Sequence, residues 1–157
     1  MAMDIAMNKT HAVVFPSKIL SSRHGHIYNI VLGANTDNGA IIGRGSYVEY
    51  DQYNEATAPE AFAAVIRGKA ANGNFEVEVT AINPQVETLL VYETVITQRE
   101  DRDLRDERLY YNEKGQVVEA LVLNIGDVFE LSKEGFNNTP VVGKAVSVVN
   151  KKLTVAS

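Results

Sequence analysis

Short alternating or apolar runs, separated at close intervals by glycine and asparagine, are the feature that most constrains the fold of this chain. In the run 74–81, apolar and polar residues alternate from Phe75 onward and therefore occupy opposite faces of a strand. The preceding Asn72-Gly73 suits the positive-φ corner of a type I′ turn, and the run 63–69 supplies the partner strand. The segment 63–81 therefore predicts a β-hairpin.

Two more hairpins are predicted further along the chain. Residues 109–111 lead through the turn 112–115 into 116–123, a run that is apolar on both faces and so indicates a strand covered on both sides. Residues 141–149 and 153–155 form the last pair, joined through 150–152. The remaining strands are expected at 10–15, 26–32, 40–42, 46–50, 87–96 and 128–131.

Helix is expected to be scarce. A short helix at 59–64, with Pro59 in the first helical position, competes with an extension of the hairpin strand back through Phe62. A chain of 157 residues, of which 45% are hydrophobic, can form the core of one domain. We therefore expect a mainly β fold over 10–157, a single small β-barrel, β-tulip or sandwich of short antiparallel strands, with an extended N-terminal arm at 1–9.

Charge and cysteine content exclude several classes of function. The 15 basic residues face 20 acidic ones, and no Lys/Arg block stands free of acids, so a nucleic-acid partner is not expected. The lack of cysteine excludes disulfides, thiolate nucleophiles and cysteine-based zinc sites. The apolar runs are far shorter than the ~20 residues of a membrane-spanning helix, and residues 1–7 lack the pattern of a secretory signal. Neither a membrane partner nor secretion is expected.

Motifs for catalysis or cofactor binding are weak. His24 and His26 share one face of an extended segment, but two imidazoles are too few for a metal site, and His11 lies in another run. Residues 43–48 echo a glycine-rich phosphate loop, yet a strand pattern follows where a helix is required, so we interpret them as a glycine bend between two strands. No serine lies in a Gly-x-Ser-x-Gly elbow. We expect no catalytic residue, no cofactor and no metal.

The densest charged feature is the segment 99–108, called here the arginine strip, in which an arginine recurs at every third residue among five acids. Solvated carboxylates beside arginines are poorly suited to act as a general acid or as a base of raised pKa. One interpretation is a solvated loop. The other is an intermolecular ion-pair strip, because alternating guanidinium and carboxylate groups pair well with a neighbour of complementary pattern.

Four segments carry a resemblance to a known family. They are Thr-His-Ala-Val-Val-Phe-Pro-Ser-Lys (10–18), Asp-Asn-Gly-Ala-Ile-Ile-Gly-Arg-Gly (37–45), Ile-Gly-Asp-Val-Phe-Glu-Leu-Ser (125–132) and Pro-Val-Val-Gly-Lys-Ala-Val (140–146). These segments resemble those of the auxiliary head proteins, or capsid decoration proteins, of tailed bacteriophages. In that family, short Asp-Asn-Gly and Gly-Asp turns punctuate a small β-barrel or β-tulip. The resemblance covers most of the domain and brings no catalytic or cofactor residue.

The resemblance implies a structural virion protein, not an enzyme, that binds the outside of a phage capsid and stabilises or decorates it. Its partners would be the major capsid protein and further copies of this chain, on the capsid surface of the virion after synthesis in the host cytoplasm. An arm that becomes ordered on the shell and the arginine strip are the candidate contacts. The residues concerned are Met1, Met3, Ile5, Met7, Lys9, Arg99, Arg102, Arg105 and Arg108.

Two alternatives remain open. A phage tail-tube or adaptor protein would share the β-rich composition. A β-barrel that binds a small molecule or glycan would use tyrosine rings as platforms, whereas the simpler interpretation is that these rings seal sheet faces. The tyrosines concerned are Tyr28, Tyr47, Tyr50, Tyr53, Tyr92, Tyr110 and Tyr111.

Overall fold

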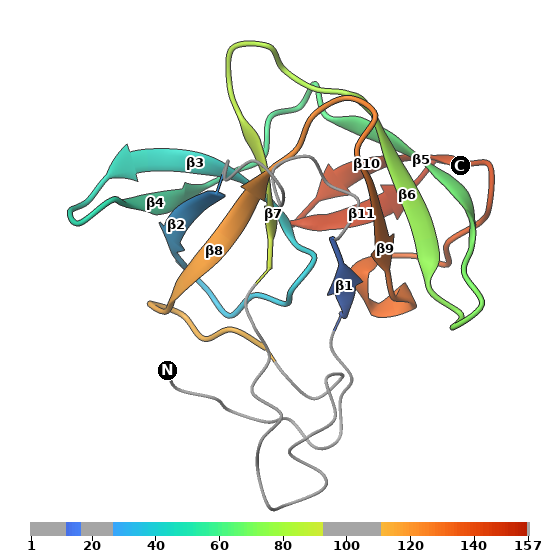
Figure 1. The fold of residues 1–157 in the computed structure, drawn as a ribbon, viewed down its shortest axis with the longest axis horizontal. Helices are drawn as coiled ribbons and strands as arrows, with labels where there is room; N and C mark the ends of the chain where they lie inside the picture. The colour runs from blue at the N-terminus through green and yellow to red at the C-terminus, as the bar shows by residue number, and fades with distance from the viewer. Residues whose placement is uncertain (1–11, 17–26, 93–110, 157) are drawn as a thin grey trace, which may run out of the picture.

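The computed structural model describes residues 12–16, 27–92 and 111–156, which form a barrel and a sheet side by side (Figure 1). The expectation of a mainly β fold with a small barrel is confirmed. The residues of the expected arm, 1–9, lie outside the described residues.

The barrel is a closed ring of five strands in the order β2-β4-β3-β7-β8. It closes because β2 pairs in parallel with β4 on one side and antiparallel with β8 on the other. All other neighbours in the ring are antiparallel. The strands are β2 (Ile27–Val31), β3 (Ile41–Tyr47), β4 (Gln52–Ala56), β7 (Thr88–Val91) and β8 (Val117–Val122).

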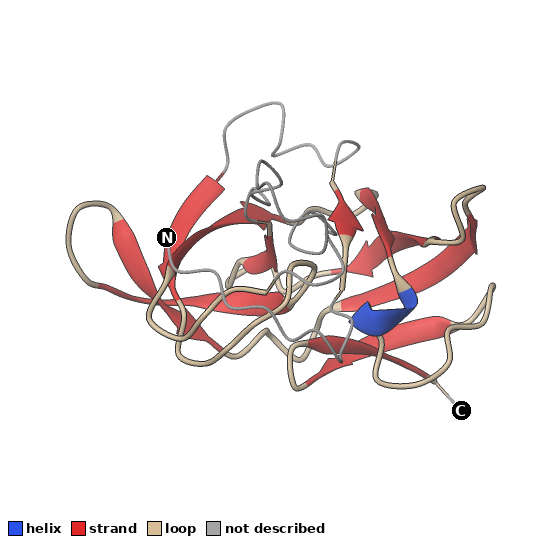
Figure 2. Cartoon of the chain, turned by 90° about the horizontal axis from the view of Figure 1, so that it is seen from below, coloured by secondary structure: helices blue, strands red, loops and turns tan. Residues whose placement is uncertain are grey.

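The second unit is a six-stranded antiparallel sheet in the order β1-β9-β6-β5-β10-β11. A single 3-10 turn, Lys133–Gly135, follows β9 and is the one helical element of the described residues (Figure 2). Phe136 then bridges Leu153, so the chain after β9 returns to the far edge of the sheet. The strands are β1 (Val14–Phe15), β5 (Ala63–Lys69), β6 (Phe75–Ala81), β9 (Val128–Leu131), β10 (Ala145–Val149) and β11 (Lys152–Val155).

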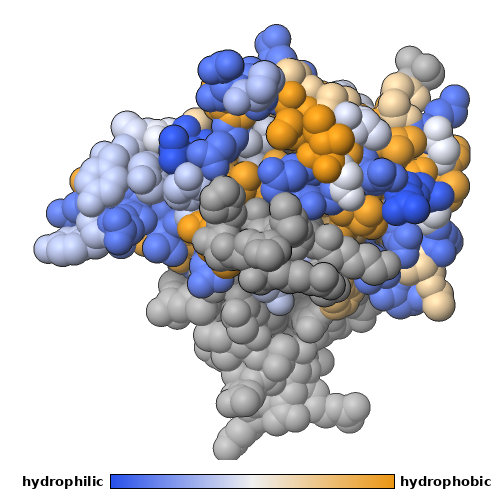
Figure 3. Space-filling model, turned by 45° about the horizontal axis from the view of Figure 1, so that its top comes forward, coloured by the Kyte–Doolittle hydropathy of each residue, from blue (hydrophilic) through white to orange (hydrophobic). Residues whose placement is uncertain are grey.

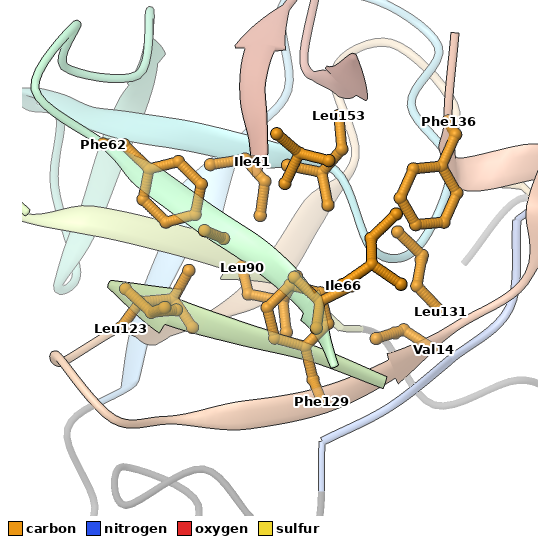
Figure 4. Packing of buried hydrophobic residues seen from close by; sticks show 14 of the residues in the cluster. Val14, Ile41, Phe62, Ile66, Leu90, Leu123, Phe129, Leu131, Phe136 and Leu153 are labelled. Atoms are coloured by element: carbon orange, nitrogen blue, oxygen red, sulfur yellow. The ribbon is translucent and has the colours of Figure 1, made fainter. Parts of the chain in front are cut away.

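Two apolar cores result, one inside the barrel and one between the barrel and the sheet. In β7, Leu89 and Val91 point into the barrel while Leu90 points out toward the sheet. The outer residues Ile41 and Leu90 pack against the inner face of the sheet, where Ile66 and other side chains from all six strands meet them (Figure 4). Strands buried on both faces explain why these runs are apolar without alternation.

The structure confirms the first and last predicted hairpins. β5 pairs with β6, and β10 pairs with β11 through the turn at Asn150-Lys151. The first turn differs from the prediction, because only Gly73, at φ 89°, has a positive φ. Ala70 N–H donates to Asn74 O, so the loop has three residues, and a single left-handed glycine completes such a loop.

The region 40–56 differs most from its prediction. The expected bend between two strands at 43–45 is wrong, since β3 continues through these residues as one strand. A Cβ at Gly43 would lie 2.5 Å from the backbone oxygen of Thr57, and one at Gly45 would lie 2.7 Å from that of Asn54. The close approach of these backbone segments explains both glycines. The strand expected at 46–50 ends at Tyr47, and β4 follows, a strand that the sequence pattern missed.

Three smaller corrections concern the other elements. Pro59–Phe62 forms only a turn, and β5 begins at Ala63, so neither the short helix nor the extended strand is found. Asn112 bridges Thr36, not β8, so the described part of the expected hairpin at 109–123 does not form. The strand β8 is covered on both faces only in its second half, because Val117 and Glu119 are exposed.

Candidate functional site

One end of the barrel carries four tyrosines and an arginine, called here the tyrosine end: Tyr28, Arg44, Tyr47, Tyr50 and Tyr53. The parallel pairing of β2 with β4 brings Tyr28 beside Tyr53, with ring centroids 5.4 Å apart in an edge-to-face arrangement. Tyr47 meets Tyr53 in the same way at 5.4 Å. Such edge-to-face pairs hold each other in defined orientations.

A shift of register positions these rings. The pairing of β3 with β4 changes between Arg44 and Tyr47, as at a β-bulge, after which Tyr47 lies opposite Tyr53. A bulge re-aims side chains and increases the local twist of a strand. The β3–β4 hairpin projects from the barrel at the left of Figure 1. Tyr47, Tyr50 and Tyr53 belong to this hairpin.

Arg44 links the rings to a carboxylate. Its guanidinium lies 4.9 Å from the ring centre of Tyr28 and 5.1 Å from that of Tyr53, within cation–π distance. The same side chain is 3.5 Å from Glu87, to which the Tyr28 hydroxyl donates a hydrogen bond of 3.0 Å. Burial, followed by this hydrogen bond and the charge of Glu87, raises the pKa of Tyr28. Tyr28 therefore stays a neutral donor at neutral pH.

The tip of the β3–β4 hairpin is exposed and acidic. Tyr50 and Asp51 both have positive φ, 49° and 58°, and Gln52 N–H donates to Glu49 O, which defines a two-residue turn of type I′. The side chain of Tyr50 is 82% exposed. Glu49 and Asp51 on either side of it are also exposed.

A pocket of about 330 Å³ lies on a different part of the molecule, between the loop before β3 and the β10–β11 turn. Lys151 extends from that turn to Glu55 of β4, with its Nζ 2.8 and 2.7 Å from the two carboxylate oxygens, and donates to the Thr36 hydroxyl at 3.0 Å. Lys152 donates to Glu134 O at 3.0 Å and lies 3.8 Å from Asp37. The lysines of the pocket thus pair with groups of the same molecule and join the sheet to the barrel.

A buried amide completes this polar network. Asn112 is fully buried and donates to Thr36 O at 3.1 Å and to the Asn38 side-chain oxygen at 3.0 Å. The backbones of Thr36 and Asn112 also exchange hydrogen bonds of 2.8 and 2.9 Å. Because its polar groups bind one another, the pocket acts as a structural joint between the two units.

The candidate contacts taken from the sequence lie outside the described residues. These are the arm residues Met1, Met3, Ile5, Met7 and Lys9, and Arg99, Arg102, Arg105 and Arg108 of the arginine strip. The histidines His11, His24 and His26 also lie outside them.

The remaining expectations concern tyrosines, metals and membranes. Tyr92 packs against the core and Tyr111 is buried, as expected for rings that seal a sheet, whereas Tyr47 and Tyr50 are exposed. Among the described residues, no three side chains of His, Cys, Asp or Glu are grouped to hold a metal ion. In the same part of the chain, no helix has the length and apolar character needed to span a bilayer.

Sequence reasoning missed the tyrosine end as a unit. In the sequence, Arg44 belongs to a glycine-rich segment with no sign of its ring partners, and the turn at Tyr50-Asp51 lacks the glycine that marks type I′ turns. The signal that was available is the density of tyrosine in 47–53, three rings in seven residues.

Comparisons with protein-family models, with curated proteins and with solved structures find no match for this chain.

Proposed function

We propose that this chain is a structural protein of a tailed bacteriophage that binds the outside of the capsid and stabilises or decorates it. The single observation that carries the proposal is the projecting β3–β4 hairpin, which presents exposed tyrosines from a barrel whose rings and charges are held in fixed positions. Tyrosine and arginine are enriched at protein interfaces, and a preorganised surface loses little entropy on binding.

The segments behind the family resemblance support this role through their position in the fold. Asp37-Asn38-Gly39 forms a turn before β3, with Ala40 N–H donating to Asp37 O. Gly126 and Gly143, both at positive φ, lie in the turns before β9 and β10. The resemblance implies that such turns punctuate the barrel and that a Val-Gly-Lys-like segment leads into the last strands.

The body suits a protein that acts as a rigid component of an assembly. Lys151 ties the sheet to the barrel through its ion pair with Glu55, and the second core joins the two units through apolar contacts. The proposed partners are the major capsid protein and further copies of this chain, and the proposed location is the capsid surface of the virion. The role requires no catalytic group.

Binding to capsids tests the proposal. Purified protein is mixed with capsids of the encoding phage assembled without it, and co-sedimentation followed by electron microscopy measures occupancy. We expect saturable binding at repeated positions on the outer surface. Protein that stays in the supernatant at all concentrations would contradict the proposal, and spontaneous rings or tubes would favour the tail-tube or adaptor alternative.

Two variants test the contacts expected from the sequence. Deletion of residues 1–9, or Arg102→Ala with Arg105→Ala, should lower capsid occupancy if the arm and the arginine strip bind the shell. The matched control is Arg67→Ala, which removes an exposed arginine of β5 that pairs with Glu78 of β6. Unchanged occupancy in both variants would remove these contacts from the proposal.

A further inference from the structure

Two hairpin turns of the described residues place non-glycine residues at positive φ, whereas glycine fills the other such positions. One is Tyr50-Asp51 in the β3–β4 turn, and the other is Asn150-Lys151 in the β10–β11 turn. Residues with a Cβ are disfavoured in this left-handed region, and Asn and Asp tolerate it better than most. Tyr50 and Lys151 are therefore the two residues whose presence the turn geometry does not explain.

The fold itself explains Lys151. Its side chain reaches Glu55 and Thr36, and its backbone oxygen accepts from Ile41 N–H at 2.8 Å. Glycine at this position would suit the turn and lose the ion pair. The side chain thus has a role inside the molecule.

The fold does not explain Tyr50. The side chain is 82% exposed, and within the described part of the chain its ring makes no hydrogen bond and no ring contact. A large aromatic side chain in a strained position at the end of a projecting hairpin adds nothing to the core. Residues held in unfavourable backbone regions cluster at functional sites, including those that bind ligands.

We propose that Tyr50 anchors a protein–protein contact by inserting into an apolar pocket of a partner whose rim carries lysine or arginine. This inference rests on the proposed function, in which the partner surface is that of the capsid. Tyrosine is among the residues that most often dominate binding energy, and it does so when a pocket removes its ring from water.

The charge of the β3–β4 turn indicates which residues the rim of the partner's pocket carries. Glu49 and Asp51 flank Tyr50 and are exposed. The arginine nearest to the tip in sequence, Arg44, is directed to Glu87 and to the ring faces of Tyr28 and Tyr53. The tip therefore presents two negative charges around an aromatic ring, which complements a basic rim.

The hairpin is preorganised for such an insertion. Asp51 N–H lies 3.4 Å from the Tyr47 hydroxyl, and Tyr47 packs edge-to-face on Tyr53. The space-filling view shows this end projecting at the left in hydrophilic colours, as expected for tyrosine beside the exposed Glu49 and Asp51 (Figure 3). A sugar platform is less well supported, since Arg44 covers ring faces of Tyr28 and Tyr53 that a sugar would use.

The test separates binding from folding, using Tyr50→Asn on capsids of the encoding phage assembled without this chain. Asparagine accepts positive φ, so the variant should unfold at the same temperature as the wild type or a few degrees above it. Its affinity for capsids should fall about 10- to 30-fold, because the anchoring ring is gone. The matched control is Ile125→Asn, which removes a 64% exposed apolar side chain from a turn before β9 and should bind like the wild type.

The charge of the tip is tested separately with Glu49→Gln and Asp51→Asn combined. This double variant should bind more weakly, about 3- to 10-fold, with a smaller dependence on salt, because rim charges mainly affect association. The control is Glu60→Gln, an exposed acid in the turn before β5.

Each outcome bears on a different claim. Wild-type protein that fails to bind capsids would overturn the proposed function and this contact with it. Capsid binding that Tyr50→Asn leaves unchanged would overturn the contact alone. Binding that is insensitive to salt and is competed by free monosaccharides would show that the tyrosine end serves a carbohydrate, which also overturns the protein contact.

Discussion

Lys151 shows at the scale of one residue how a side-chain contact can offset an unfavourable backbone conformation, here a φ of 69°. Its Nζ is 2.7 Å from a carboxylate oxygen of Glu55, and the two side chains are only 28% and 14% exposed. Lys151→Met should lower the free energy of unfolding by about 1–3 kcal/mol, because it leaves a largely buried carboxylate without its partner. Denaturant titration measures the change.

The control for that substitution is Lys114→Met, at an exposed position in the turn before β8. Exposed substitutions of this kind change stability by no more than about 0.5 kcal/mol. Equal effects of the two variants would mean that the contact between Lys151 and Glu55 contributes nothing to stability.

Tyr28 makes stability depend on pH at the alkaline end. Its pKa is raised above the usual 10.0, first by burial and then by the hydrogen bond to Glu87. Below pH 10 the hydroxyl is protonated in both states, so its contribution to stability is complete. As the pH rises through the folded-state pKa, the unfolded state has already ionised, and the contribution is lost.

Tyr28→Phe should therefore lose about 1 kcal/mol of stability at neutral pH and fall less steeply above about pH 10 than the wild type. Denaturant titrations across this pH range measure both effects. Tyr50→Phe, at an exposed ring, is the control and should match the wild type at neutral pH. Parallel profiles for Tyr28→Phe and the wild type would show that this hydroxyl does not titrate with folding.

At the scale of elements, β3 depends on two glycines that permit close approach of the following chain. A Cβ at Gly45 would lie 2.7 Å from the backbone oxygen of Asn54, which cannot move away as a flexible side chain can. Gly45→Ala should destabilise the protein by about 1–3 kcal/mol. Gly68→Ala in β5, where nothing lies within 4 Å, is the control and should be neutral or slightly stabilising. A neutral Gly45→Ala would contradict the close approach.

Local patterns predicted the elements that depend on local causes. Alternation located β6 to within one residue, and the turn before it located its partner β5. The expected strand at 128–131 matches β9, and the one at 87–96 contains β7 but extends beyond its observed end at Val91. The pairing of 109–123 was wrong because Asn112 is bound by Thr36 and Asn38, residues more than 70 positions away. A turn motif gives no information about such a partner.

The candidate site was predicted only in part for a similar reason. The run 47–53 contains three tyrosines, a residue type that favours strands. Its turn, Tyr50-Asp51, has no glycine to mark a hairpin, so β4 was not expected. The bulge that places Tyr47 opposite Tyr53 depends on the pairing of β3 with β4. The position of Arg44 beside the rings of Tyr28 and Tyr53 likewise depends on contacts between strands. The sequence thus shows which residues the tyrosine end contains, but not how they are arranged in space.

At the scale of the whole molecule, the barrel and the sheet share one core. Leu90 of β7 is fully buried and belongs to the cluster that contains residues of all six sheet strands. Its neighbours Leu89 and Val91 belong to the barrel interior. A single strand thus contributes to both cores, so loss of packing on one side must weaken the other.

Leu90→Ala should therefore destabilise the barrel and the sheet together, by about 2–5 kcal/mol, in a single cooperative transition. Hydrogen exchange measures this by residue: amides of β8 in the barrel and β6 in the sheet should lose protection by the same factor, because both open only on global unfolding. Val117→Ala, at an exposed position of β8, is the control and should change stability by about 0.5 kcal/mol or less. Separate transitions, with sheet amides protected after barrel amides exchange, would show that the shared core does not couple the two units.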